Sequence, residues 1–315
     1  MAITTFNIGE ITIHRVVEQE GPFFDPLEFF PSLTPEVLEE NRGWMTEGGY
    51  LDRQSGQLVL CIQSYLLQTQ HHNILIDSCV GNHKPRPTRP FWNMMNTDRF
   101  EKGLAGTGVS VDQIDYVMCT HLHVDHVGWN TRLENGRWIP TFPKAKYVFA
   151  DRELAYWTET EKNDPSVAPW ITDSVLPIVA AKRGEVVKSD YQFSDIVKLL
   201  PTPGHTIDHY SVQVGRPGAN AVITGDMIHS PLQARYPELG MRVDYSSPQA
   251  GESRRKLFSC LCDTSTLICT AHFPSPSSGR MKRWGEGFKF ESVQRVVRAQ
   301  EVAEQAGGQS RWIMR

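Results

Sequence analysis

Short apolar runs bounded by polar turn residues recur along the chain and predict a protein rich in β-strands. In the first half these runs predict strands over residues 11–17, 58–69, 73–79, 116–120 and 147–150. Only a short polar stretch separates the second run from the third, which predicts a hairpin. In the second half the same pattern predicts strands over residues 196–200, 210–214, 221–224 and 266–270.

Helical spacing of apolar residues follows the strands of each half. It predicts helices over residues 151–162, with Asp151 as the N-cap, and over residues 248–262. A final amphipathic helix is predicted over residues 291–305, where four valines fall on one face. Strands and helices in this order predict an α/β protein whose two sheets pack together between helical layers, a four-layer αββα sandwich.

The length of 315 residues fits one large duplicated domain or two smaller ones. We expect a single domain over residues 1–315, with pseudo-duplicated halves at about 1–195 and 196–315. Two predicted loops, residues 21–31 and 81–96, are unusually apolar. They either pack over the core or form a substrate lid or a dimer contact, because exposed apolar patches usually mark binding surfaces. A homodimer is therefore one expectation.

Composition narrows the possible partners. The chain has 32 Lys and Arg against 36 Asp and Glu, a formal net charge of −4, which argues against nucleic acid and anionic membranes as partners. No apolar run reaches the roughly 18 residues of a membrane span. The first residues lack the features of a signal peptide, and the six cysteines fall mostly in apolar segments, as buried reduced thiols do. A cytoplasmic protein is expected.

The segment from His121 to His126 carries the strongest chemical signal. His121, His123, Asp125 and His126 fall within six residues directly after a predicted strand. Imidazole nitrogen and carboxylate oxygen are ligands that suit zinc and similar divalent ions. Four potential ligands at this density favour a metal site over histidines that merely pack in the core.

Three further ligand types follow predicted strands in the second half: His205, Asp226 and His272. Sites in α/β proteins lie beyond the carboxyl ends of strands. Each of these residues alone is a weak signal. Together with the first cluster they make a set of seven candidate ligands.

The order His-x-His-x-Asp-His, then His, Asp and His, resembles that of the metallo-β-lactamase-fold hydrolases, as does Asp77 at the end of an early strand. The resemblance implies two metal sites. It places His121, His123 and His205 on one divalent ion, Asp125, His126 and His272 on a second, and Asp226 between them. Zinc is the ion expected first. Asp77 would orient a ligand histidine or its loop.

Two such ions would hold a bridging hydroxide at neutral pH, and that hydroxide would attack a carbonyl or phosphoryl centre. Asp125 or Asp226 would relay a proton to the leaving group. The predicted activity is therefore metal-dependent hydrolysis of a small-molecule substrate.

The ligand types favour one branch of the family. Common zinc β-lactamases carry Arg and Cys where this chain has His126 and Asp226, so lactam hydrolysis is not expected. The N-terminal extension, residues 80–84 and the Phe273–Pro274 pair resemble the quorum-lactone lactonases and methyl-parathion-hydrolase-like esterases. These enzymes open lactones or cleave aryl esters and aryl phosphotriesters. Such lactonases often place a Tyr three residues beyond the bridging Asp, where this chain has His229 as a hydrogen-bond donor or an orienting group.

Aromatic residues predict an apolar substrate pocket. Its walls are expected from Phe91, Trp92, Met94 and Met95, with Tyr156 and Trp157 on the helix that begins near Asp151, and with Trp129 close to the metal loop. Core packing is the alternative for Tyr156 and Trp157. Walls of this kind favour an aromatic or acyl substrate of small charge.

Other functions fit parts of the pattern. A mononuclear iron oxygenase of the persulfide dioxygenase type would need only three ligands, such as His121, His123 and Asp226. A glyoxalase II-like thioesterase shares the histidine pattern, and a metal-binding scaffold without catalysis is a third alternative.

Overall fold

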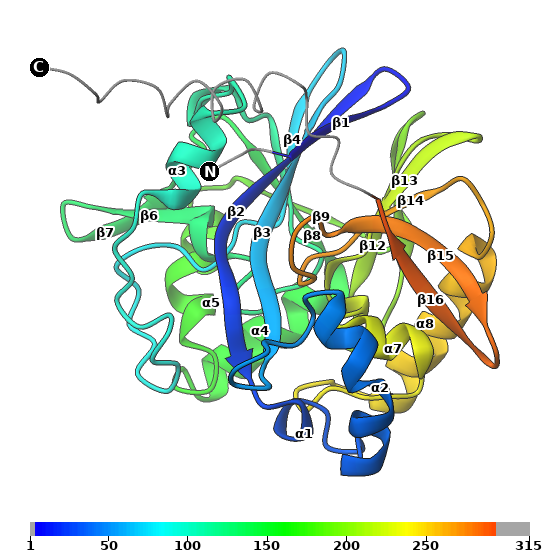
Figure 1. Cartoon of the computed structure of the whole chain (residues 1–315). Coiled ribbons are helices and arrows are strands. Elements are labelled where there is room, and N and C mark those ends of the chain that lie inside the picture. The colour runs from blue at the N-terminus through cyan, green and yellow to red at the C-terminus, as the bar shows by residue number, and fades with distance from the viewer. Residues whose placement is uncertain (1–3, 294–315) are drawn as a thin grey trace, which may run out of the picture.

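The computed structural model describes residues 4–293, in which two seven-stranded sheets form the centre of the molecule (Figure 1). In spatial order, the first sheet contains β1 (Thr4–Ile8), β2 (Ile11–Phe24), β3 (Leu58–Gln68), β4 (Asn73–Ile76), β5 (Tyr116–Met118), β8 (Lys146–Ala150) and β9 (Gly184–Val187). The second contains β10 (Gln192–Ser194), β11 (Val197–Pro201), β12 (Tyr210–Arg216), β13 (Ala219–Ile223), β14 (Leu267–Cys269), β15 (Ser278–Trp284) and β16 (Gly287–Ser292). A separate hairpin joins β6 (Thr131–Glu134) and β7 (Arg137–Pro140).

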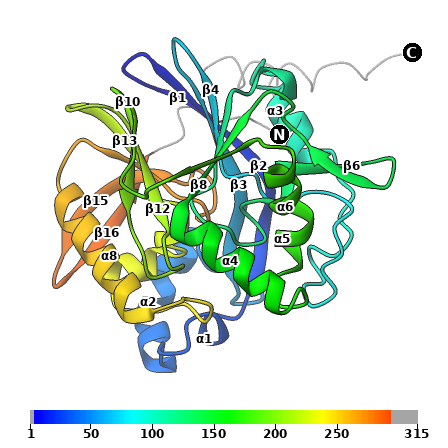
Figure 2. The ribbon, with the colours of Figure 1, turned by 180° about the vertical axis from the view of Figure 1, so that it is seen from behind.

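Helices cover the outer faces of both sheets (Figure 2). The α-helices are α1 (Pro26–Phe29), α2 (Pro35–Glu47), α3 (Arg99–Ala105), α4 (Asp151–Asn163), α5 (Pro169–Ser174), α6 (Leu176–Ala180), α7 (Pro231–Arg235) and α8 (Ser247–Leu261). Three short 3₁₀ turns lie at η1 (Val111–Gln113), η2 (Gly128–Asn130) and η3 (Gly225–Met227). The predicted strands and the two earlier predicted helices are present with shifted ends, and the hairpin of β3 and β4 is confirmed.

Side chains that alternate along each strand pack against the layers on both sides of the sheet. In β4, Ile74 and Ile76 face the second sheet, where they join a buried cluster with Val212 and Ile223. Leu75, between them, faces the other way and packs in the cluster that contains Ile171 of α5. Successive side chains of a strand point to opposite faces, so one short segment contributes to two cores. The predicted four-layer αββα sandwich is confirmed.

The parallel strands bring the candidate ligands to one edge. β4 pairs in parallel with β5, and β13 pairs in parallel with β14. The segments that leave their carboxyl ends carry Asp77, the 120–126 loop, Asp226 and His272. Residues nearly 200 positions apart in sequence thus meet at one edge of the two sheets.

Three local predictions were wrong. Residues 21–24 are not loop, because β2 continues to Phe24 in antiparallel pairing with β3. Asp151 lies in the first turn of α4, and Ala150 is the N-cap residue, so the acidic side chain interacts with the helix dipole rather than capping. Glu291 and Ser292 belong to β16, whose Phe288 and Phe290 pack into the core beside α8. Residues 294–305 of the predicted final helix lie outside the described residues.

The N-terminal extension forms its own apolar cluster. Phe29 and Phe30 of the α1 region, and Leu38 of α2, pack against Leu58 and Leu232. This packing attaches α1 and α2 to the same edge that carries the candidate ligands (Figure 1). None of the helices described within residues 4–293 has the length and apolar character that a membrane span requires.

Candidate metal centre

The loop that follows β5 is held in place by backbone hydrogen bonds before any ligand is considered. His126 N–H donates to the carbonyl of His123 at 3.1 Å, which closes the turn between them. Ser78 N–H donates to the carbonyl of His126 at 2.8 Å, which attaches the turn to the segment after β4. The short spacing of the motif therefore becomes a tight turn whose histidines face one point.

The structure brings all seven predicted ligands together in two groups, and a third, overlapping group joins Asp226 and His272 to His229. His121, His123, His205 and Asp226 form the first group, and Asp125, His126 and His272 form the second. Within each group one potential ligand atom per residue lies within 4.8 Å of the others. The first two groups correspond to the two sites that the resemblance implied.

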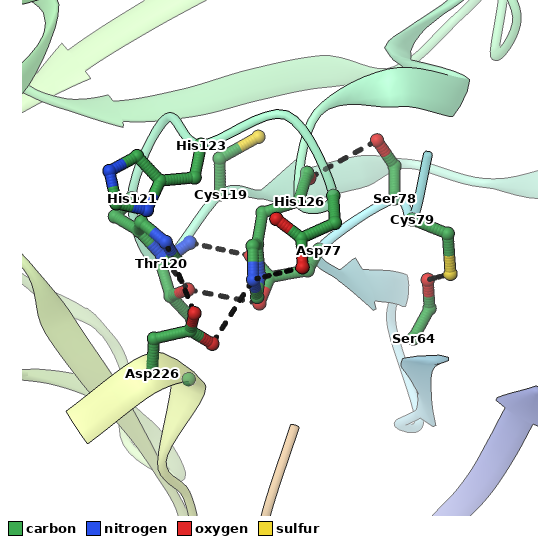
Figure 3. Close-up of polar contacts among 12 residues, drawn as sticks. Ser64, Asp77, Ser78, Cys79, Cys119, Thr120, His121, His123, His126 and Asp226 are labelled. Carbon is green, nitrogen blue, oxygen red and sulfur yellow. Dashed lines mark hydrogen bonds and ion pairs between the residues drawn. The ribbon is translucent and has the colours of Figure 1, made fainter. Parts of the chain in front are cut away.

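Asp226 faces both groups with different oxygens. Its Oδ1 lies 3.0 Å from His126 Nε2 and 2.9 Å from His272 Nε2. Its Oδ2 lies 3.3 Å from His205 Nε2 and 3.6 Å from His121 Nε2. Figure 3 shows this carboxylate below the histidine turn. One carboxylate divided between two clusters has the arrangement that a bridging ligand requires.

The outward-facing nitrogens of these histidines are paired with protein groups. His272 Nδ1 lies 2.8 Å from the carbonyl of Cys61, which can only accept, so the proton of the neutral ring is on Nδ1. His205 Nδ1 lies 2.9 Å from Asp244 Oδ1, and His126 Nδ1 lies 2.9 Å from Asp77 Oδ2. Partners of this kind fix the tautomer of the neutral rings, whose Nε2 lone pairs then point inward.

The inward-facing atoms fit a cation. His121 Nε2, His126 Nε2 and Asp226 Oδ1 are buried without a hydrogen-bond partner in the described residues. All three are acceptors when the rings are neutral, and acceptors cannot satisfy one another. Imidazole and carboxylate donors at this density suit zinc and other divalent transition metals, so the residues present fit the pair of ions.

Burial and charge set the protonation of the cluster. Burial, with the charge of His126, holds the pKa of His121 well below its usual value. Burial opposes ionisation of Asp226, but the surrounding histidines, His126 first, outweigh it and hold its pKa well below the usual range. Burial alone would lower the pKa of His205, but Asp226 and Asp244 raise it to about 9. Protons and metal ions therefore compete for the same atoms.

Asp77 connects the two strands that carry the turn. Its Oδ1 accepts the Thr120 N–H at 2.7 Å, and its Oδ2 accepts the Thr120 hydroxyl at 2.9 Å as well as facing His126 (Figure 3). Asp77 itself has φ of +58°, an uncommon conformation for a residue other than glycine. The carboxylate thus orients one ligand and fixes the start of the loop.

His229 lies beside the Asp226 carboxylate, with Nε2 3.1 Å from Oδ2. Burial lowers its pKa to about 4, so the ring is neutral at neutral pH. Asp226 can only accept, so the proton is on Nε2 and is directed to Asp226, while Nδ1 is buried without a partner. The ring also stacks on His272 with centroids 5.1 Å apart. In this tautomer His229 orients Asp226 and offers a lone pair on its other side.

A cavity of about 370 Å³ opens onto the cluster. His123, Asp125, Asp226, His229 and His272 contribute to its lining. Its remaining lining residues are mostly aromatic or aliphatic: Phe23, Phe24, Phe29, Leu60, Ile62, Thr88, Arg89, Pro90, Phe91, Trp92, Val124, Trp157, Trp170, Met241, Arg242 and Val243. Both apolar segments singled out in the sequence contribute to this wall.

The predicted pocket residues divide into two sets. Phe91, Trp92 and Trp157 line the cavity. Met95 does not line it and packs in the core beside the first sheet. Trp129 is also outside the cavity lining, since its ring stacks on Phe100 with centroids 5.0 Å apart and its Nε1–H donates to Glu18.

Comparison with known proteins decides the family. The family model of the metallo-β-lactamase superfamily matches residues 62–272, about two thirds of the chain, and this region contains every candidate ligand. The chain belongs to the metallo-β-lactamase superfamily. The resemblance drawn from the histidine motif is confirmed.

Its relatives within the superfamily include N-acyl homoserine lactonases. One from Bacillus sp is 26% identical over 182 residues, which cover 54% of this chain and 62% of the relative. Another, from Bacillus cereus, is 26% identical over 167 residues, 50% of this chain and 59% of the relative. The chain thus spans about six tenths of the length of the curated lactonases it matches.

Solved structures share the whole superfamily fold. The hydrolase AbOPH aligns with a TM-score of 0.76 at 22% identity, covering 93% of this chain and 97% of the other. AidC, described as a dizinc quorum-quenching lactonase, aligns with a TM-score of 0.75 at 20% identity, covering 93% and 98%. A probable metal-dependent hydrolase from Staphylococcus aureus has a TM-score of 0.73 at 18% identity, covering 92% and 100%. At these identities the likeness concerns the fold.

Sequence reasoning missed two residues of the centre, His209 and Asp244. His209 Nε2 accepts the backbone N–H of Asp226 at 2.9 Å, and Asp244 holds His205. The spacing of His209 from His205 in the segment Gly-His-Thr-Ile-Asp-His offered a signal for the first. Asp244 stands in an irregular segment, 39 positions from its partner, and nothing in the local pattern distinguishes it.

Proposed function

We propose that the chain is a metal-dependent hydrolase with a dinuclear centre, which opens lactones or cleaves aryl esters, aryl phosphotriesters included. The observation that carries the proposal is the division of the two Asp226 oxygens between two ligand groups. When bound, two divalent ions supply an acidified water at neutral pH and polarise the attacked oxygen. The names of the lactonase relatives support the substrate class.

The residues of the chain then have distinct tasks. Asp226 lies between the two ligand groups, and His229 orients its carboxylate. Asp125 reaches the cavity and lies 3.7 Å from His272 Nε2, so it is placed to pass a proton to the leaving group. The aromatic walls hold the organic part of the substrate and exclude water.

The second ligand group weighs against the alternatives that need one metal. An iron oxygenase would use three ligands, yet Asp125, His126 and His272 converge as closely as the first group does. Stoichiometric analysis separates these functions: about two zinc ions per chain support the hydrolase, and one iron with substrate-dependent oxygen uptake would contradict it. A glyoxalase II-like thioesterase would instead prefer thioesters over oxygen esters.

A substrate panel tests the activity. The metal-loaded protein is assayed on acyl lactones, aryl esters, aryl phosphotriesters and thioesters of similar size. We expect the lactones or aryl esters to have the highest kcat/KM, with loss of activity on chelation and recovery on adding Zn²⁺. Turnover confined to thioesters, or unaffected by chelation, would contradict the proposal.

The remaining expectations stay predictions from the sequence. They are a single domain over residues 1–315, zinc as the ion, a possible homodimer and a cytoplasmic location.

A further inference from the structure

Two arginines of the cavity wall, Arg89 and Arg242, have no charge partner. Within residues 4–293 their guanidinium groups form no ion pair and donate no hydrogen bond, although both line the cavity. Arg89 is half-buried and Arg242 is exposed, whereas the fully buried arginines are paired. Arg86 meets both oxygens of Asp173 at 2.8 Å each, and Arg254 donates to three backbone carbonyls. The two cavity arginines thus keep their guanidinium donors available for a ligand.

Aromatic faces hold both side chains at the wall. Arg89 Cζ lies 5.2 Å from the ring centroid of Trp170, and Arg242 Cζ lies 5.1 Å from that of Phe24. A guanidinium stacked on a ring keeps its edge available, because its five N–H donors lie in the plane of the group. Stacking thus orders the two groups without using their hydrogen-bond donors.

The segments that carry the arginines are anchored to the metal centre and the core. Arg242 precedes by two residues the Asp244 that holds His205, and its own N–H donates to the carbonyl of Phe29 in α1. The backbone N–H of Arg89 donates to the carbonyl of Arg86 at 2.8 Å, and the guanidinium of Arg86 is held by Asp173. The fold therefore fixes the backbone from which each of the two arginine side chains extends.

Electrostatics at this wall favour an anion. Arg89 is half-buried, and burial together with the charges of Arg86 and Arg242 lowers its pKa, while Asp125 alone acts in the opposite direction. Asp125 is also a candidate ligand, so bound divalent ions would neutralise its charge. The cavity then combines apolar walls with an uncompensated positive side, and a small oxyanion is the partner that meets both demands.

From this arrangement we propose that Arg89 and Arg242 form a recognition site for a carboxylate carried by the substrate, on an apolar body and away from the bond that is cleaved. This inference rests on the proposed function. The aromatic residues alone led us to expect a substrate of small charge, and the two arginines now replace that expectation with a negatively charged substrate. The substrate class becomes an ester or lactone with a free acid group.

A matched pair of esters tests the site. One is an aryl monoester of a straight-chain dicarboxylic acid, and the other is the same compound with its free carboxylate capped as a methyl ester. We expect the metal-loaded protein to prefer the acid, and Arg89→Gln or Arg242→Gln to raise KM for the acid about tenfold, the loss of one charge-assisted contact. The KM for the capped ester and the kcat of both should stay within about twofold. Arg137→Gln, an exposed arginine outside the cavity, is the control.

The outcomes separate the two proposals. Equal kinetics for acid and capped ester, in the wild type and in both variants, would overturn the carboxylate site while leaving the hydrolase intact. A fall in kcat for both esters would overturn it as well, by placing the arginines at the reacting centre. If neither ester is cleaved, the site is judged by binding, and the full substrate panel decides the proposed activity separately. A lower affinity of both variants for 4-phenylbutanoate, but not for 4-phenylbutanamide, supports the site, and unchanged affinity for both compounds overturns it.

Discussion

The backbone N–H of Asp226 donates to His209 Nε2 at 2.9 Å, so a buried histidine outside the ligand groups fixes the residue that faces both of them. Because Nε2 accepts, the ring proton is on Nδ1 and is donated to Thr202 Oγ1 at 2.8 Å. Burial lowers the pKa of His209 to about 3, which keeps this neutral form. The contacts continue through Ser211 to the carbonyl of Thr224, two residues before Asp226.

His209 also explains the glycine before Asp226. Gly225 has φ of +52°, and a side chain there would lie 2.7 Å from His209 Nε2 and from Thr120 Oγ1. The turn is therefore held from both sides at close range.

Replacing His209 by leucine should weaken metal binding about 10- to 100-fold, as loss of an orienting partner typically does. His209→Gln keeps an acceptor near the Nε2 position and should recover most of the affinity. Chelator competition on the folded variants measures the effect. Equal affinities of the leucine variant and the wild type would show that Asp226 needs no such support.

Two carboxylates orient histidines of different groups, and their removal should affect different ions. Asp77→Asn should weaken the ion near His126, and Asp244→Asn the ion near His205, each about 10- to 100-fold. Titration of the chelator-treated protein with Zn²⁺ or Co²⁺ separates the two binding steps. Both variants weakening the same step would contradict the assignment of ligands to groups.

The stability of the metal-free protein should fall as the pH rises. Asp226 and Asp244 overcome burial and raise the pKa of His205 to about 9 from 6.5, so its stabilising contribution is complete below pH 6.5 and lost as the pH passes 9. The loss is up to about 3 kcal/mol for this group, and the raised pKa values of His126 and His272 act in the same direction.

In the metal-loaded protein an ion replaces those protons, so this loss should be absent. Calorimetric Tm values from pH 6.5 to 9.5, with and without Zn²⁺, should therefore diverge with pH. Parallel curves would contradict the competition between protons and ions.

Trp92 should contribute to binding of the organic group. Its ring lines the cavity, and its Nε1–H donates to Gln19 Oε1 at 3.1 Å. Trp92→Ala should raise KM for an aryl ester about tenfold through lost apolar contact, with little change in kcat. Trp92→Phe, which keeps an aromatic face, should retain most of the affinity. Unchanged steady-state kinetics of the alanine variant would show that Trp92 packs within the protein and does not contribute to substrate binding.

The features that depend on local sequence pattern could be predicted from the sequence. The ligands of the 121–126 turn and the strands before Asp226 and His272 follow from spacing and alternation. The support of the ligands was not predictable, because Asp244 and Arg242 acquire their roles through contacts between distant segments. The β16 error has a similar origin: Phe288 and Phe290 alternate as in a strand, but the valines that follow suggested a helix.

The most direct test counts ions. Chelator-treated wild-type protein, titrated with Zn²⁺ and analysed for bound metal, should take up two ions per chain, and Asp226→Ala should retain fewer than two because the carboxylate that faces both groups is lost. A single ion in the wild type, or two ions held equally well by the Asp226 variant, would contradict a centre built around one shared carboxylate.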